Sequence, residues 1–191
     1  MVVPFIKGNR EMEDLVVAKK IAQGDKQVFE TFFNEYNLKL LNLCYGMLHN
    51  RAEAEDLVQE VFIEIFNNAK YFKGNAKLST WVYRIAINKT ISHIRKKKIR
   101  NIFIPLENIQ VSDTDSDWNE QELKLKYLKA AIDSLPAKQR TAMVLFTYDQ
   151  MPQKDIAEVM NCSLAAVEVM IHRAKKILKQ KLETKYKEIE Q

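Results

Sequence analysis

The sequence predicts an all-α protein with two small helical domains, joined by a flexible acidic linker, the C-terminal domain containing a helix-turn-helix. Three observations predict this fold class. Only 4 glycines and 4 prolines occur in 191 residues, too few for the many tight turns of a sandwich or barrel. Apolar residues recur at spacings of three and four in several segments. Between them, residues from about Arg100 to Trp118 lose this periodicity and contain Pro105 and an acidic cluster at 112–117.

Two helices are expected near the N-terminus. Asp25 is a suitable N-cap for a helix that continues to about Met47. Asn50, with Glu53 three residues later, resembles a capping box for a second helix. The apolar arc of that second helix is broad and comprises Leu57, Val58, Val61, Phe62, Ile65 and Phe66.

A third helix precedes the linker. The loop at 73–75 separates it from the second helix, and Ser79 or Thr80 can serve as its N-cap. We expect it to end near Lys98, with an apolar stripe formed by Tyr83, Ile87, Ile91 and Ile94.

Four helical segments follow the linker, at about 123–133, 136–148, 152–160 and from 164 into the Lys-rich tail. Pro136 and Pro152 fall in the first turn of the second and third of these segments, where proline is favoured. We therefore expect an N-terminal domain at 12–100, a linker at 101–121 and a C-terminal domain at 122–184.

Charge is segregated along the chain, although the net charge is only +5. No acidic residue occurs from Ile65 to Leu106, while Glu and Asp dominate the stretch 50–64 just before it. Ten basic residues fall in the acid-free stretch: Lys70, Lys73, Lys77, Arg84, Lys89, Arg95, Lys96, Lys97, Lys98 and Arg100. One charge run alone can be a solvated helix face. A second basic block after His172 favours a polyanion bound by two modules, and nucleic acid fits.

The segment 151–178 has the pattern of a helix-turn-helix, with a short helix, a turn at 161–163 and a second helix. One face of the second helix is apolar: Val167, Met170, Ile171, Ala174 and Leu178. The other presents Ala165, Val169, His172 and Lys176, with Glu168 and Arg173 at its margins. An ordinary helical hairpin is the alternative, but the basic flank and the small residues at the helix start favour DNA.

The basic third helix carries a second candidate surface. Five of its residues fall within an arc of about 80° on a helical wheel: Trp81, Arg84, Asn88, Ser92 and Arg95. The preceding loop, 71–77, mixes aromatic residues with lysines, as single-strand binding surfaces do. Trp81 taken alone can equally be a core anchor.

Other chemistries have little support. Cys44 and Cys162 lie in different halves of the chain and are expected to be free thiols in a reducing compartment. The three histidines have no metal-ligand spacing, so we expect no metal and no cofactor. No nucleophile-base constellation or Gly-rich phosphate loop indicates an enzyme. No apolar run approaches membrane-spanning length, and we expect a cytoplasmic location without membrane insertion.

Three motifs together resemble the bacterial RNA polymerase sigma factors of the sigma-70 family, extracytoplasmic-function (ECF) group. They are DLVQEVFIEIF at 56–66, FKGNAKLSTWVYRIAIN at 72–88, and the helix-turn-helix that ends in IHRAKKIL at 171–178. The resemblance extends from about Leu15 to Leu182. It implies a factor that binds core RNA polymerase through its β′ and β subunits, recognises the −35 element, and melts the −10 element to contact the non-template strand. Whether an anti-sigma factor is a further partner stays open.

The resemblance also implies a role for particular residues. Core polymerase is contacted by Asp56, Gln59 and Glu60. The −10 element is contacted by Phe72, Lys73, Asn75, Lys77, Trp81, Arg84, Asn88, Ser92 and Arg95. The −35 element is contacted by Gln153, Lys154, Ala165, Glu168, Val169, His172, Arg173 and Lys176.

The recognition helix departs from the family pattern at Glu168 and Val169, where a basic and a small polar residue are usual, so the −35 contacts cannot be copied across. Two other functions remain open on the residues alone. A stand-alone regulator would use the helix-turn-helix on duplex DNA but would not need the aromatic loop beside an acidic face. A nucleic-acid enzyme would need metal-binding carboxylates, which the stretch 65–106 lacks.

Overall fold

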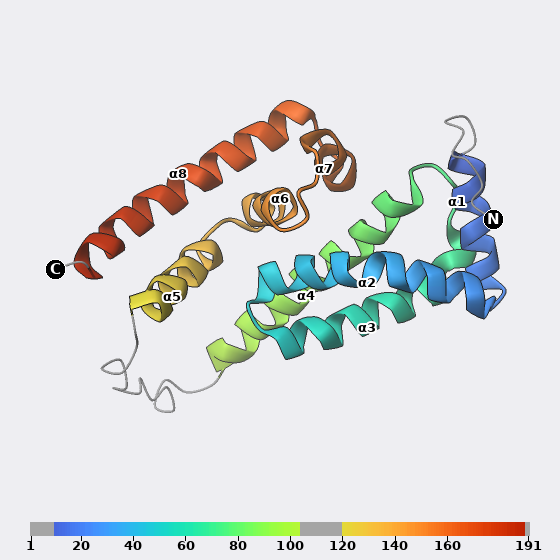
Figure 1. Ribbon diagram of the computed structural model, residues 1–191, viewed down its shortest axis with the longest axis horizontal. Coiled ribbons are helices and arrows are strands. Elements are labelled where there is room, and N and C mark those ends of the chain that lie inside the picture. The colour runs from blue at the N-terminus through green and yellow to red at the C-terminus, as the bar shows by residue number, and fades with distance from the viewer. Residues whose placement is uncertain (1–9, 104–119, 190–191) are drawn as a thin grey trace. The chain divides into compact units, whose positions relative to one another are not determined.

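The computed structural model describes residues 10–103 and 120–189, and every regular element in these two ranges is a helix. Figure 1 shows the order of the elements. They are α1 (Arg10–Ala22), α2 (Lys26–Leu48), α3 (Arg51–Asn68), the short 3-10 helix η1 (Ala69–Tyr71), α4 (Leu78–Phe103), α5 (Glu120–Asp133), α6 (Ala137–Thr147), α7 (Gln153–Met160) and α8 (Leu164–Ile189). The predicted all-α fold class is confirmed. Most of the predicted linker lies outside the described residues.

The chain divides into two compact units. The helices α1, α2 and α3 and the first part of α4 belong to the first unit, and α5, α6 and α8 belong to the second. No helix in the described ranges has the length and apolar character needed to span a membrane.

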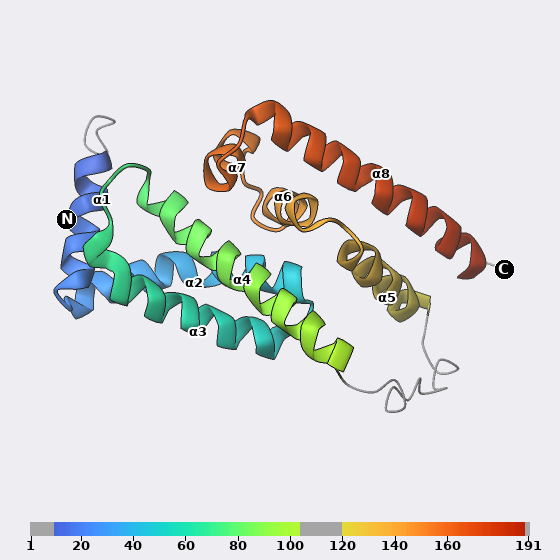
Figure 2. The same ribbon diagram turned by 180° about the vertical axis from the view of Figure 1, so that it is seen from behind.

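The first unit is built on α2 and α3, which lie side by side in Figures 1 and 2. Asp25 caps α2 by accepting hydrogen bonds from the backbone N–H groups of Gln27 and Val28, and Asn50 caps α3 by accepting one from Glu53. Both predicted N-caps are therefore confirmed. The fully buried side chains between these helices include Leu40, Leu43, Met47, Val61 and Ile65.

A helix that the sequence pattern does not predict, α1, packs against α2, α3 and η1. Its buried residues are Ala18 and Ile21. Its contacts with α3 and η1 join segments that are distant in the sequence.

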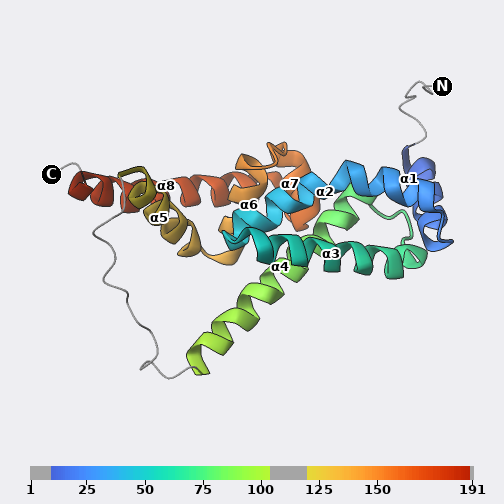
Figure 3. The ribbon, with the colours of Figure 1, turned by 60° about the horizontal axis from the view of Figure 1, so that its bottom comes forward.

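The helix α4 differs from its prediction at both ends. It begins at Leu78, so Ser79 and Thr80 lie inside its first turn rather than capping it. The N–H of Leu78 donates instead to the carboxylate of Asp14 on α1, at 2.7 Å. At the other end α4 continues beyond Lys98 to Phe103, and Figure 3 shows this part projecting past α2 and α3.

The second unit packs α8 against α5 and α6. Its core includes Leu135, Leu145, Ile156, Val167 and Ala174. Pro136, expected in the first turn of α6, is instead its N-cap, and its carbonyl accepts a hydrogen bond from the N–H of Arg140 at 2.9 Å. The Arg140 side chain is buried and forms an ion pair with Asp133 at the end of α5, which joins the two helices across their short connection.

Candidate nucleic-acid interface

The acidic face lies on the outer side of α3. Asp56, Gln59 and Glu60 are all exposed, and positions three and four apart are neighbours on a helix surface. Ile63 lies one turn further along and is 61% exposed. Phe66 is 43% exposed, although the centroid of its ring lies 5.7 Å from that of Phe29. The sequence pattern assigns Phe66 to the buried arc and no role to Ile63. An apolar pair beside polar side chains is typical of a contact surface.

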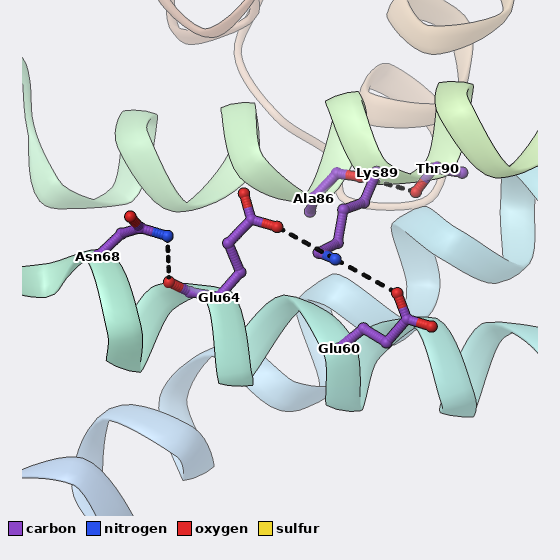
Figure 4. A network of polar contacts seen from close by, with 6 residues as sticks. All are labelled: Glu60, Glu64, Asn68, Ala86, Lys89 and Thr90. Carbon is purple, nitrogen blue, oxygen red and sulfur yellow. Dashed lines mark hydrogen bonds and ion pairs between the residues drawn. The ribbon is translucent and has the colours of Figure 1, made fainter.

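Glu60 also has a partner within the protein. Figure 4 shows the ammonium group of Lys89 on α4 between two carboxylates of α3, 3.3 Å from Glu60 and 3.1 Å from Glu64. Desolvation lowers the pKa of Lys89, but the hydrogen bonds and charges of Glu64 and Glu60 outweigh it, so the pKa is raised above its usual 10.5. The predicted docking residue Glu60 therefore also links α3 to α4.

The neighbouring residue, Thr90, anchors the same part of α4 to α2. It is fully buried, and its hydroxyl donates to the carbonyl of Ala86 at 2.8 Å, as Figure 4 shows. The Sγ of Cys44 on α2 lies 3.5 Å from the same hydroxyl oxygen. A buried hydroxyl with a hydrogen-bond partner avoids the cost of an unsatisfied polar group. The face of α4 that carries Thr90 is thus fixed against the core.

The opposite face of α4 carries the predicted −10 stripe. Because α4 is a continuous helix from Leu78 to Phe103, the spacing that places five residues on one arc is retained. Asn88 and Arg95 are exposed, and Trp81 and Ser92 are partly buried. Trp81 thus keeps part of its surface exposed.

The loop before α4 has a defined shape. The rings of Phe72 and Trp81 are 5.5 Å apart at an angle of 54°, so these predicted −10 residues pack on each other. Gly74 has φ +74°, a backbone conformation that glycine adopts without strain. Lys73 and Asn75 on either side are exposed, and Lys77 near the end is partly buried.

The predicted helix-turn-helix is present, and local hydrogen bonds build its turn. The N–H of Cys162 donates to the carbonyl of Ala157 at 3.0 Å and that of Asn161 to Glu158 at 3.3 Å, with Asn161 at φ +51°. This pattern is a Schellman motif, in which asparagine can take the left-handed position. Ser163 then caps α8 by accepting from the N–H of Ala166 at 3.2 Å.

The two faces of α8 agree with the predicted recognition helix. Val167, Ile171 and Ala174 are buried, while Met170 and Leu178 are partly buried. The exposed residues include every predicted −35 contact on this helix: Ala165, Glu168, Val169, His172, Arg173 and Lys176. On α7, Lys154 is exposed and Gln153 is partly buried.

Comparison with known proteins identifies the family. The sequence model for Sigma-70 region 2 matches residues 32–99, and that for Sigma-70 region 4 matches residues 125–178. The ECF RNA polymerase sigma factor SigW of Bacillus subtilis (strain 168) is 35% identical over 176 residues, which cover 86% of this chain and 94% of that protein. The chain belongs to the sigma-70 family of RNA polymerase sigma factors, in the ECF group.

Other relatives and solved structures agree. The RNA polymerase sigma-H factor of Pseudomonas aeruginosa is 28% identical over 187 residues, covering 90% of this chain and 94% of that protein. The fold resembles CnrH in its complex with the cytosolic domain of CnrY, with a TM-score of 0.67, 21% identity, and 90% and 97% of the two chains covered. It also resembles the sigma factor RpoE of Bartonella quintana, in complex with the anti-sigma factor NepR, with a TM-score of 0.58, 21% identity, and 81% and 98% covered.

As a sigma factor, the protein directs promoter-specific transcription initiation, with core RNA polymerase and promoter DNA as its partners. It is an initiation factor and not an enzyme, so the nucleic-acid enzyme suggested as an alternative is wrong. Within the described ranges, no group of three or more His, Cys, Asp or Glu side chains is arranged to hold a metal ion.

The Lys89 bridge predicts how stability of the sigma factor depends on pH. Lys89→Met keeps the apolar stem but removes the charge, and should lower the free energy of unfolding by about 1 kcal/mol at neutral pH, the upper end for partly exposed ion pairs. Because the pKa of Lys89 is raised in the folded state, the difference from wild type should be complete below about pH 10.5 and shrink as pH rises through the folded pKa. Urea unfolding from about pH 7 to 11 measures it.

The control for this measurement is Lys39→Met, which removes a looser surface pair at 3.7 Å from Glu35. It should change stability by less than about 0.5 kcal/mol. If Lys89→Met and wild type have equal free energies of unfolding at every pH, the ion pairs of Lys89 with the two carboxylates do not stabilise the fold.

Proposed function

We propose that the sigma factor acts through three surfaces, in two domains at 12–100 and 122–184 with a linker at 101–121. The exposed face of α3 docks on the β′ subunit of core polymerase. The loop at 72–77 and the outer stripe of α4 open the −10 element and hold its non-template strand. The outer face of α8, with the start of α7, reads the −35 element.

One observation carries this proposal: none of the twenty residues predicted for these surfaces is buried. Buried residues occur between them on the same helices, so a small error in the predicted helix faces would have placed several of them in the core. Most of these side chains can therefore be reached by a partner, although Glu60 already pairs with Lys89. A basic helix face alone suits duplex DNA. The aromatic loop next to the basic helix α4 suits an unpaired strand, because bases can stack on its rings.

Docking on a polymerase surface is supported by the composition of the α3 face. Carboxylates recognise a basic partner, and the exposed Ile63 and Phe66 supply the apolar contact that gives protein interfaces most of their affinity. We add Ile63 to the proposed docking residues. The β subunit and an anti-sigma factor are further proposed partners, the second because both solved structures named above are complexes with a second protein, one of them called an anti-sigma factor.

The experiment that tests the whole proposal is transcription in vitro from genomic promoter fragments, with core polymerase and with or without the sigma factor. Initiation at defined sites only when the factor is present supports it. Variants with separate defects in core binding, promoter opening and −35 recognition then test the three surfaces one at a time.

Asp56→Lys should weaken binding to core polymerase at least tenfold, because it places a cation where a basic partner is expected. The control is Glu30→Lys, which makes the same kind of charge reversal at an exposed position on α2. Fluorescence titration with core polymerase measures both. Charge reversal at Glu60 is avoided, since it would place a second cation beside Lys89. Equal affinities for the two variants would argue against a docking face at Asp56.

Asn75→Ala should reduce promoter opening about fivefold and alter the preference at one −10 position, because contacts to an unpaired base are worth about 1–3 kcal/mol. Asn75 is exposed, so the substitution leaves the packing of the loop unchanged. Phe72→Ala is a weaker test, since it also removes the ring that packs on Trp81. Permanganate footprinting measures opening, with Asn67→Ala at an exposed site on α3 as the control. Unchanged footprints and base preference would make the loop a plain connector.

Glu168→Lys should tighten binding of −35 duplex by the holoenzyme, steepen its salt dependence and relax the preference at one base pair. A carboxylate in the major groove repels phosphate but can accept a hydrogen bond from the cytosine amino group. Glu183→Lys, at an exposed position further along α8, adds the same charge and serves as the control. Selection from a promoter library measures the preference. If both variants tighten binding equally and neither changes the preference, Glu168 does not read a base.

A further inference from the structure

The N-terminal helix α1 contacts the segment that leads into α4. In Figures 1 and 2 it lies beside η1 and the following loop, and it packs against η1. This contact joins residues that are about 60 positions apart in the sequence. Two neighbouring side chains of α1, Asp14 and Leu15, make the specific contacts.

Asp14 caps α4. Its Oδ2 accepts a hydrogen bond from the N–H of Leu78 at 2.7 Å. Leu78 is the first residue of α4, so its N–H has no acceptor within the helix. A carboxylate at a helix N-terminus is stabilised by the hydrogen bond and by the helix dipole. The cap that the sequence pattern places at Ser79 or Thr80 is thus supplied by another helix.

Leu15 covers the middle of the same loop. A Cβ added to Gly74 would lie 3.2 Å from two side-chain atoms of Leu15, so this side chain rests directly on the glycine backbone. Gly74, at φ +74°, begins the bend of the loop at 74–76. Contacts from α1 therefore fix the loop at its turn and at its end, and the exposed Asn75 lies between these two points.

Asp14 places a negative charge beside a basic surface. The loop and α4 form the stretch of the chain that contains basic but no acidic residues, and a carboxylate beside such a surface repels DNA phosphates. A neutral side chain would fill the same space without that cost. The positive end of the α4 dipole, together with the hydrogen bond from Leu78, offsets this repulsion.

We propose that Asp14 is a positioning residue for −10 recognition: it holds the loop at 72–77 in the shape that receives an unpaired base. The inference rests on the proposed role of this loop. A loop already in its bound shape loses less conformational entropy when the base enters, so the cap increases affinity for the strand without touching it. Asp14 is not among the buried residues that form the core between α2 and α3.

The test compares Asp14→Ala, Asp14→Asn and Glu13→Ala in the assembled holoenzyme. The probe is a fluorescent single-stranded oligonucleotide with the non-template −10 sequence of a promoter that the wild-type holoenzyme transcribes. Asp14→Ala should bind it about fivefold more weakly, with unchanged affinity for core polymerase. Asp14→Asn should recover most of the affinity, because asparagine caps helices as well as aspartate does. Glu13→Ala, at an exposed site on the same helix, should match wild type.

A second measurement reports on the loop itself. Trp81 lies one turn into α4, and Trp118 is the other tryptophan of the chain. In a Trp118→Phe background, acrylamide quenching of Trp81 should increase for Asp14→Ala and not for Asp14→Asn.

The outcomes separate the inference from the proposed function. If the wild-type holoenzyme does not prefer the −10 oligonucleotide over a scrambled one, the role of the loop is wrong. If wild type discriminates and Asp14→Ala binds equally well, Asp14 has no positioning role. If Asp14→Ala loses core binding and thermal stability to the same extent as oligonucleotide binding, the cap is merely structural, which also overturns the inference.

Discussion

The burial of one face of α4 is the constraint on which the orientation of the proposed −10 stripe depends. Val82, Ala86 and Thr90 follow one another at intervals of four and are all fully buried. Small and β-branched residues in one row let a helix approach its neighbours closely. On a helical wheel this row is about 160° from the centre of the arc that contains Trp81 and Asn88. Because one face of α4 is buried, the proposed −10 stripe on the opposite face points outward, and no additional contact is needed to orient it.

The two charged segments of this unit are adjacent, and one residue joins them. Lys89 is a member of the basic stretch, but its ammonium group is bound by Glu60 and Glu64. Two carboxylates in successive turns of α3 thus hold a single cation of α4, as Figure 4 shows. Asp56 and Gln59 lie outside this bridge and are exposed. The basic residues proposed to contact DNA and the acidic residues proposed to contact polymerase are thus on different helices.

Signals that act over a few residues made most of the fold predictable. The N-caps at Asp25 and Asn50, the turn at 161–163 and the buried face of α8 all depend on residues within four or five positions of one another. The contacts that sequence reasoning missed are distant along the chain. Lys89 pairs with residues 25 and 29 positions away, and Asp14 caps a helix 64 positions away. No local pattern distinguishes such a residue from an ordinary exposed charge.

This difference between local and distant contacts separates the two proposed DNA-reading elements. The turn before α8 is built by its own backbone, through the Schellman motif and the Ser163 cap, so the recognition helix presents the same face wherever the segment folds. The loop before α4 contains one left-handed glycine and depends on α1 for its cap. A substitution in α1 can therefore change how the loop is presented while the helix-turn-helix is unaffected. The shape of the helix-turn-helix can therefore be deduced from the residues that form it, whereas the shape of the loop before α4 cannot.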